Sequence, residues 1–108
     1  MSTDDVFVVP DDAVPGPGRM TRVEAFGERV MIANIDDAYF AVSDTCTHED
    51  ASLSHGALKT ANRQVTCPLH GSRFCLVTGA ALDEPAELPL TVYTAHFSDS
   101  RLTLHRRK

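Results

Sequence analysis

Hydrophobic and polar positions alternate along much of the chain, and no long stretch has the spacing of an amphipathic helix. Short runs rich in Val, Ile, Phe and Tyr are interrupted about every ten residues by Gly, Pro or Asp, a pattern typical of antiparallel strands. We therefore predict β-strands over residues 5–9, 19–26, 28–35, 38–43, 57–60, 64–66, 73–77, 90–97 and 101–105. The strands within 19–43 follow one another directly and should form an antiparallel meander.

Proline, glycine and aspartate mark the connections between these strands. Residues 11–18 contain too many prolines and glycines for a regular element, and the two prolines within 82–89 remove backbone donors. Asp36 and Asp37 are expected to form a tight turn between two strands. The pattern therefore predicts an all-β fold, an antiparallel sandwich or barrel into which a smaller subdomain, residues 44–83, is inserted.

Length and charge restrict the functions that the chain can have. The 108 residues suffice for a single domain, 1–108, and 43% of them are hydrophobic, as in ordinary globular proteins. No apolar run is long enough to cross a membrane, and the acidic first residues do not resemble a signal peptide, so we expect a cytoplasmic protein. The net charge of −5 argues against a nucleic-acid partner and is compatible with docking onto basic patches of other proteins.

Two short motifs carry the candidate chemistry. Cys46 and His48 form a Cys-x-His motif, Cys67 and His70 form a Cys-x-x-His motif, and 18 residues separate the two. Two thiolates and two imidazoles suit either a tetrahedral zinc ion or a binuclear iron–sulfur cluster. Zinc modules usually pair Cys with Cys and His with His at short spacing. The mixed motifs instead favour a cluster in which one iron is bound by both cysteines and the other by both histidines.

These motifs and their neighbours resemble the Rieske [2Fe–2S] family, on the stretches CTHEDASLS, CPLHGSRF and EPAELPLTVY. The similarity is greatest to the small ferredoxins of bacterial aromatic-ring-hydroxylating dioxygenase systems. The resemblance implies a Rieske-like β-fold with a cluster-binding subdomain and one [2Fe–2S] cluster. By the same resemblance, Cys46 and Cys67 would bind one iron, and His48 and His70 the other.

The resemblance also implies roles for residues around the cluster. Ser72 would donate a hydrogen bond to a bridging sulfide, and Phe74 stands where other members have a tyrosine that reaches a cysteine sulfur. Pro85 would belong to a proline loop that covers the cluster. Outside the motifs, Cys75 is expected to be a small buried apolar residue, and His55 an exposed loop residue.

The implied function is that of a monomeric electron carrier and not of an enzyme. It would accept one electron from an NAD(P)H-dependent flavin reductase and pass it to a terminal oxygenase that hydroxylates an aromatic ring. Two alternatives stay open: a small subunit of an assimilatory nitrite reductase, and a structural zinc-binding module. A terminal oxygenase would need a second iron site, for which His55, His96 and His105 form no plausible pair.

Overall fold

Two antiparallel sheets make up the part of the chain that the computed structural model describes, residues 6–46, 51–69, 71–84 and 88–106. The large sheet has the strand order β1-β9-β8-β4-β3-β2, and the small sheet has the order β5-β6-β7. The large sheet consists of β1 (Val6–Val8), β2 (Met20–Ala25), β3 (Glu28–Ile35), β4 (Ala38–Ser43), β8 (Val92–Ser98) and β9 (Arg101–Arg106). The small sheet consists of β5 (Ala57–Lys59), β6 (Gln64–Thr66) and β7 (Arg73–Cys75).

The hairpins of the large sheet turn on pairs of residues with positive φ. In these pairs φ lies between 52° and 76°, as expected for two-residue type I′ turns, whose twist matches that of the flanking strands. The pairs are Phe26 and Gly27, Asp36 and Asp37, and Asp99 and Ser100. A phenylalanine rarely adopts this conformation. The ring of Phe26 is held by stacking on Tyr93, with ring centroids 5.6 Å apart.

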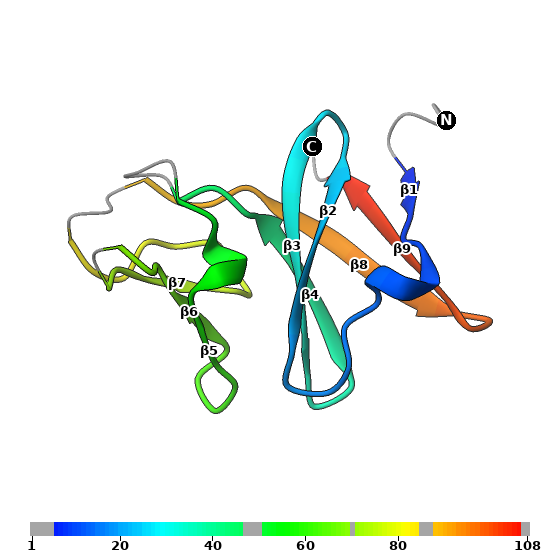
Figure 1. Cartoon of the computed structure of the whole chain (residues 1–108), viewed down its shortest axis with the longest axis horizontal. Helices are drawn as coiled ribbons and strands as arrows, with labels where there is room; N and C mark the ends of the chain where they lie inside the picture. Colours follow the sequence, from blue (N-terminus) through cyan, green and yellow to red (C-terminus); the bar gives the residue numbers. More distant parts are fainter. Residues whose placement is uncertain (1–5, 47–50, 70, 85–87, 107–108) are drawn as a thin grey trace.

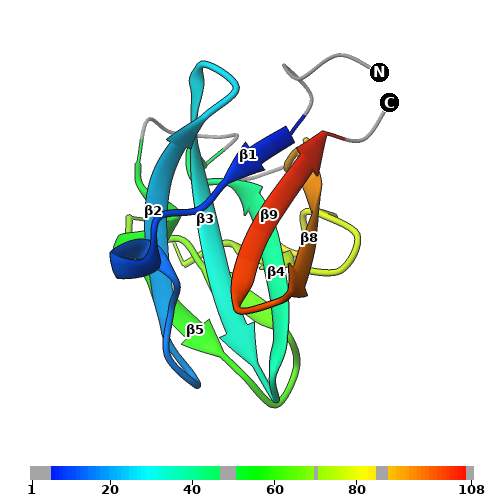
Figure 2. The same ribbon diagram turned by 90° about the vertical axis from the view of Figure 1, so that its right-hand side faces the viewer.

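Strand β3 is buried on both faces from Val30 onward, which explains why its sequence is apolar there except at Asn34. Val30 and Ile32 pack in a core on the inner side of the curled large sheet, which Figure 2 shows from one end. Met31, Ala33 and Ile35 point the other way and pack in a second core, which the small sheet covers. The fold therefore consists of two cores on opposite faces of the same strands, and β4 also contributes to both, with Ala41 in the first core and Val42 in the second.

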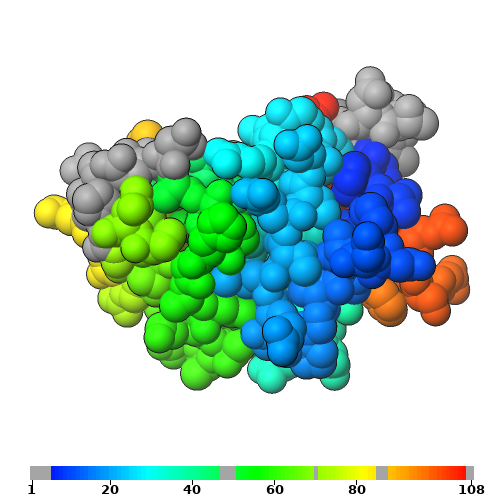
Figure 3. Space-filling view, in the orientation of Figure 1, coloured from blue at the N-terminus to red at the C-terminus, as the bar shows by residue number. Residues whose placement is uncertain are grey.

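The small sheet is inserted between two neighbouring strands of the large sheet. The chain leaves β4 at Ser43 and returns to it as β8, where Ala41 and Val42 pair with Tyr93 and Val92. In Figure 1 the intervening segment lies to one side of the large sheet, and Figure 3 shows it in direct contact with the blue and cyan surface of β2 and β3. Strands β2 and β3 therefore lie against the segment that contains the two motifs, although they are far from it in the sequence.

The predicted all-β fold and its antiparallel meander are confirmed, and β3 and β4 have the predicted limits. Other limits were wrong by one or two residues: the strand predicted over 90–97 spans Val92–Ser98, and the strand predicted over 57–60 ends at Lys59. The strand predicted to reach residue 77 ends at Cys75, because the Gly79 N–H donates back to the Cys75 carbonyl at 2.8 Å. Residues Asp11–Ala13, expected to be irregular, form a short 3-10 helix, η2. No helix in the described part of the chain is long and apolar enough to span a membrane.

Candidate metal centre

The first motif begins at Cys46, three residues after the end of β4, at the base of a closed loop. Thr45 and Ser52 pair as an isolated bridge, and just inside it the Cys46 N–H donates to the Ala51 carbonyl at 2.9 Å. Cys46 is buried. Residues 47–50, which include His48, lie outside the described residues. The paired residues at the base of the loop thus accompany a first cysteine that is excluded from solvent.

The second motif has the same construction. Cys67 follows β6, and its N–H donates to the Ser72 carbonyl at 2.8 Å, so the bond again spans five residues. The Gly71 N–H also donates to the Cys67 carbonyl, at 3.1 Å. Gly71 has φ of 73°, a conformation that glycine adopts without steric cost and that reverses the chain here. His70 lies outside the described residues. A threonine precedes the cysteine in both loops, as Thr45 and Thr66.

The structure buries Cys46 and Cys67 in one core, beneath the small sheet, together with Val65, Phe74 and Leu76. None of the three cysteines forms a disulfide. Within the described residues, no three His, Cys, Asp or Glu side chains form a metal site. The two predicted histidine ligands lie outside those residues, so the complete ligand set stays a prediction.

Ser72 provides a test of whether these loops fit an iron–sulfur group. It is 1% exposed, and its Oγ atom has no hydrogen-bond partner among the described residues. Leaving a buried hydroxyl unpaired costs about 1–3 kcal/mol, so an acceptor is expected beside it. A sulfur atom of a cluster held by the neighbouring Cys67 would be such an acceptor. Two buried thiols, which are soft ligands, and one unpaired donor therefore fit the predicted cofactor.

An ion pair fastens the next segment of the chain to β7. The Arg73 Nε and Nη2 atoms donate to the two carboxylate oxygens of Asp83, at 2.6 and 3.0 Å. The hydrogen bonds to Asp83 and its negative charge raise the pKa of Arg73, and those from Arg73 and its positive charge lower the pKa of Asp83. Further on, the Leu90 N–H donates to the Gly79 carbonyl at 2.7 Å. The segment that contains Pro85 is thus anchored on both sides, although Pro85 itself lies outside the described residues.

The remaining predicted residues are placed as follows. Phe74 is fully buried in the core of the small sheet, and His55 is exposed in the short 3-10 helix η3 (Leu53–His55), as predicted. The prediction of a buried Cys75 was wrong. Cys75 is half-buried at the end of β7, where a hydrogen bond with the Thr78 side chain lowers the pKa of its thiol.

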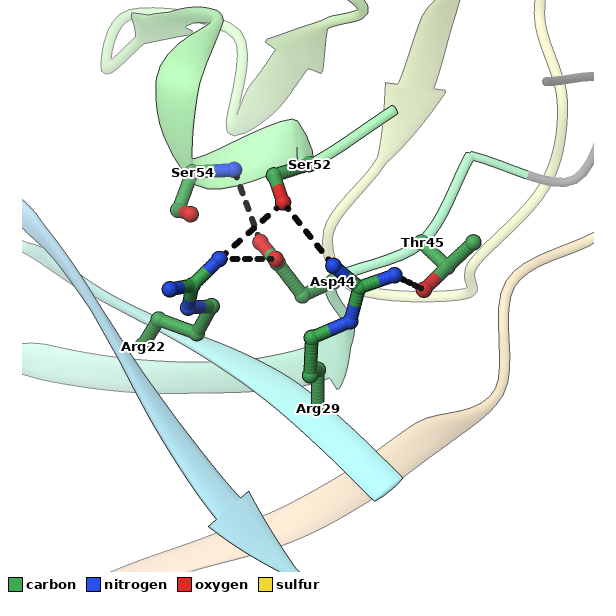
Figure 4. A network of polar contacts seen from close by, with 6 residues as sticks. All are labelled: Arg22, Arg29, Asp44, Thr45, Ser52 and Ser54. Atoms are coloured by element: carbon green, nitrogen blue, oxygen red, sulfur yellow. Dashed lines mark hydrogen bonds and ion pairs between the residues drawn. The ribbon is translucent and has the colours of Figure 1, made fainter. Parts of the chain in front are cut away.

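The sequence did not reveal a polar network that joins the first loop to β2 and β3, shown in Figure 4. Its members are Arg22, Arg29, Asp44, Thr45, Ser52 and Ser54. Asp44, a charged residue two positions before Cys46, was the one available signal.

A comparison with protein families decides the nature of the centre. The model of the Rieske [2Fe–2S] domain matches residues 4–94. The chain belongs to the Rieske [2Fe–2S] family. Its cofactor is accordingly a Rieske-type [2Fe–2S] cluster, as the mixed motifs predicted, and the alternative of a structural zinc module is set aside.

Two curated relatives of this Rieske chain are ferredoxins. The 3-phenylpropionate/cinnamic acid dioxygenase ferredoxin subunit of Shigella boydii serotype 4 (strain Sb227) is 37% identical over 95 residues, 88% of this chain and 87% of that protein. The biphenyl 2,3-dioxygenase ferredoxin component of Rhodococcus jostii (strain RHA1) is 40% identical over 77 residues, 71% of this chain and 70% of that protein.

Solved structures with the same fold include a carrier in complex with its oxygenase. A chain in the complex of reduced oxygenase and oxidized ferredoxin in carbazole 1,9a-dioxygenase has a TM-score of 0.86 and 29% identity, over 98% of both chains. A putative NADH-dependent nitrite reductase small subunit from Mycobacterium tuberculosis has a TM-score of 0.79 at 24% identity, over 95% of this chain and 96% of that one. At that identity the second likeness shows the fold alone.

The unpaired hydroxyl of Ser72 should tune the reduction potential. Reduction adds one negative charge to the cluster, so a donor aimed at its sulfur favours the reduced state. If the hydrogen bond is about 1 kcal/mol stronger in that state, Ser72→Ala should lower the potential by about 40 mV. A redox titration followed by visible absorption measures this shift. Ser98→Ala, exposed on β8, is the matched control, and an unchanged potential in Ser72→Ala would mean that the hydroxyl has another partner.

Proposed function

We propose that this Rieske protein is the ferredoxin component of an aromatic-ring-hydroxylating dioxygenase system. It receives single electrons from an NAD(P)H-dependent flavin reductase and delivers them to a terminal oxygenase, and it has no catalytic site of its own. The observation that carries this proposal is that the similarity extends over nearly the full length of proteins that are themselves ferredoxin components. The nicotinamide-dependent partner implies a cytoplasmic location, and we expect the carrier to act as a monomer.

We further propose that Cys46 and Cys67 bind one iron and that His48 and His70 bind the other. The cluster then supplies one-electron chemistry, with a potential raised by replacing two thiolates with neutral imidazoles. Residues 44–83 form the cluster-binding subdomain of the single domain 1–108. The chain's own contribution is to exclude water from both cysteines, which are 4% and 2% exposed, and to offer the Ser72 hydroxyl.

The surface beside the second loop supports a docking role. Leu69, directly before His70, is 60% exposed. Leu82 and Leu88, on either side of the Pro85 segment, are 42% and 66% exposed. An exposed apolar residue next to the proposed ligand His70 in the sequence, such as Leu69, would let a partner approach the iron closely and exclude water between them. The net charge of −5 favours partners with basic surfaces.

Reconstitution tests the proposed function. The holoprotein, added to a ferredoxin-dependent flavin reductase and a terminal aromatic-ring oxygenase, should restore NAD(P)H-dependent hydroxylation. Omitting this chain, or replacing it with the Cys67→Ser variant, should abolish turnover. Hydroxylation of an aromatic compound by this chain and a chemical reductant, without the oxygenase, would contradict the carrier role. Support of nitrite reduction in place of hydroxylation would favour the nitrite reductase alternative.

A further inference from the structure

Asp44 connects the first cysteine loop to the large sheet through both its backbone and its side chain. It follows β4 directly and is 0% exposed. Its N–H donates to the Arg29 carbonyl of β3 at 3.0 Å, and its own carbonyl accepts the Leu53 N–H at 2.6 Å. Its Oδ1 atom accepts the Ser54 N–H at 2.8 Å. Asp44 is therefore bonded to β3 on one side and to η3, which follows the loop, on the other.

The second carboxylate oxygen of Asp44 is not fully paired. Its Oδ2 atom is buried and has no hydrogen-bond partner among the described residues. The Arg22 Nη1 atom lies 3.9 Å from Oδ2, which is within ion-pair range but beyond a hydrogen bond. A buried carboxylate with one oxygen unpaired costs free energy relative to an apolar residue. Its presence therefore calls for a role other than stability.

Two arginines hold the base of the same loop, as Figure 4 shows. Arg22 on β2 donates to the Ser52 Oγ atom at 3.2 Å. Arg29 on β3 donates to the same atom at 3.5 Å and to the Thr45 Oγ1 atom at 3.1 Å. Thr45 and Ser52 are the paired residues just outside the bond that closes the Cys46 loop. The large sheet thus places two positive charges and one negative charge beside this loop.

The second loop is held in a different way. Arg73, which follows it, pairs with Asp83 at the surface, within the part of the chain that contains the small sheet. The first loop is instead held by residues from β2, β3 and the end of β4, and the charge of Asp44 is fully buried there. Because burial removes screening by water and salt, the Asp44 charge acts on its surroundings more strongly than an exposed one.

We propose that Asp44 is a positioning residue of the iron–sulfur centre, which with Arg22 fixes the first cysteine loop on the large sheet and sets the reduction potential. This inference rests on the proposed function of Cys46 as an iron ligand. Only Thr45 separates Asp44 from Cys46, so their Cα atoms are at most about 7 Å apart. Reduction adds a negative charge to the cluster, and a buried carboxylate two residues from the proposed ligand Cys46 opposes it. The Arg22 guanidinium acts in the opposite direction.

Redox titration of three holoprotein variants tests the inference. Asp44→Asn keeps an oxygen that can accept the Ser54 N–H and removes the charge. Asp44→Asn should raise the reduction potential by about 59 mV. At a fixed applied potential, this is about a tenfold change of the reduced-to-oxidised ratio in favour of the reduced form. Arg22→Gln should lower the potential, whereas Arg22→Lys should restore it. Asp99→Asn, an exposed change of the same charge in the β8–β9 turn, should leave it unchanged.

Potentials of Asp44→Asn and Arg22→Gln that match that of Asp99→Asn would overturn the inference. If Asp44→Asn fails to retain the cluster, the potentials of Arg22→Gln and Arg22→Lys test the inference instead. Arg22 is 42% exposed, so its replacement leaves the core intact. The measurement needs neither reductase nor oxygenase. A wild-type protein without an iron–sulfur cluster would therefore refute the proposed function, whereas a cluster whose potential ignores both charges would refute this inference alone.

Discussion

Replacing Cys67 by serine should give a colourless protein that contains no iron and is poorly folded. Cys67 is 2% exposed in the core beneath the small sheet, and a serine hydroxyl there is a poor ligand for ferric iron. Without the cluster, the core loses the link between the two loops, and binding of such a group is coupled to folding. Cys46→Ser should have the same effect. Visible absorption, together with iron and acid-labile sulfide analysis of the purified variants, measures the loss.

Cys75→Ser is the matched control, because it makes the same chemical change at a half-buried cysteine outside both motifs. It should retain the iron and sulfide content of the wild-type protein. If Cys46→Ser and Cys67→Ser instead kept their iron–sulfur absorption unchanged, the proposed ligands would be wrong.

The second large effect is expected from Gly56→Ala, which acts on both loops through the backbone. A Cβ atom at Gly56 would lie 1.9 Å from the Thr66 carbonyl oxygen and 3.1 Å from the Leu53 carbonyl oxygen. Thr66 directly precedes Cys67, and Leu53 belongs to the helix that follows the Cys46 loop. Neither backbone atom can move without displacing a loop. We expect destabilisation of about 3 kcal/mol or more, and a fall of about 12 °C or more in the unfolding temperature.

Gly16→Ala provides the comparison for this variant. A Cβ atom there would meet only the Arg19 Cδ atom, at 3.9 Å, which is an ordinary contact. Thermal scans of both holoproteins at one heating rate, followed by loss of cluster absorption, should show a large decrease for Gly56→Ala and none for Gly16→Ala. Equal unfolding temperatures would show that β6 does not pass this closely to Gly56.

Local patterns were sufficient to predict most strands, because each lies between turn residues. The limits of β3 and β4 were correct since Asp36 and Asp37 mark the turn between them. The pairing of β1 with β9, in which Val6 lies opposite His105, has no local signal. It joins the two ends of the chain and depends on closure of the inner core. The burial of both faces of β3 explains the unbroken apolar run over residues 30–33.

The site was predictable where its chemistry is concentrated in short motifs. The spacing of the motifs indicated both cysteines, and the structure buries them in one core, with Ser72 also buried. The contribution of Arg22 could not be predicted, because a charged residue in an alternating strand is normally exposed to solvent. The Arg22 guanidinium lies 3.9 Å from the Asp44 carboxylate only because the inserted segment packs against β2.

The central claim is that two cysteines and two histidines of this chain bind one [2Fe–2S] cluster. Pulsed EPR of the reduced protein tests it most directly, with the protein prepared once with natural histidine and once with histidine labelled with ¹⁵N. We predict nitrogen couplings from two ring nitrogens bound to iron, all of which change to ¹⁵N couplings on labelling. A reduced cluster without strong nitrogen coupling, or with coupling that histidine labelling leaves unchanged, would contradict the account.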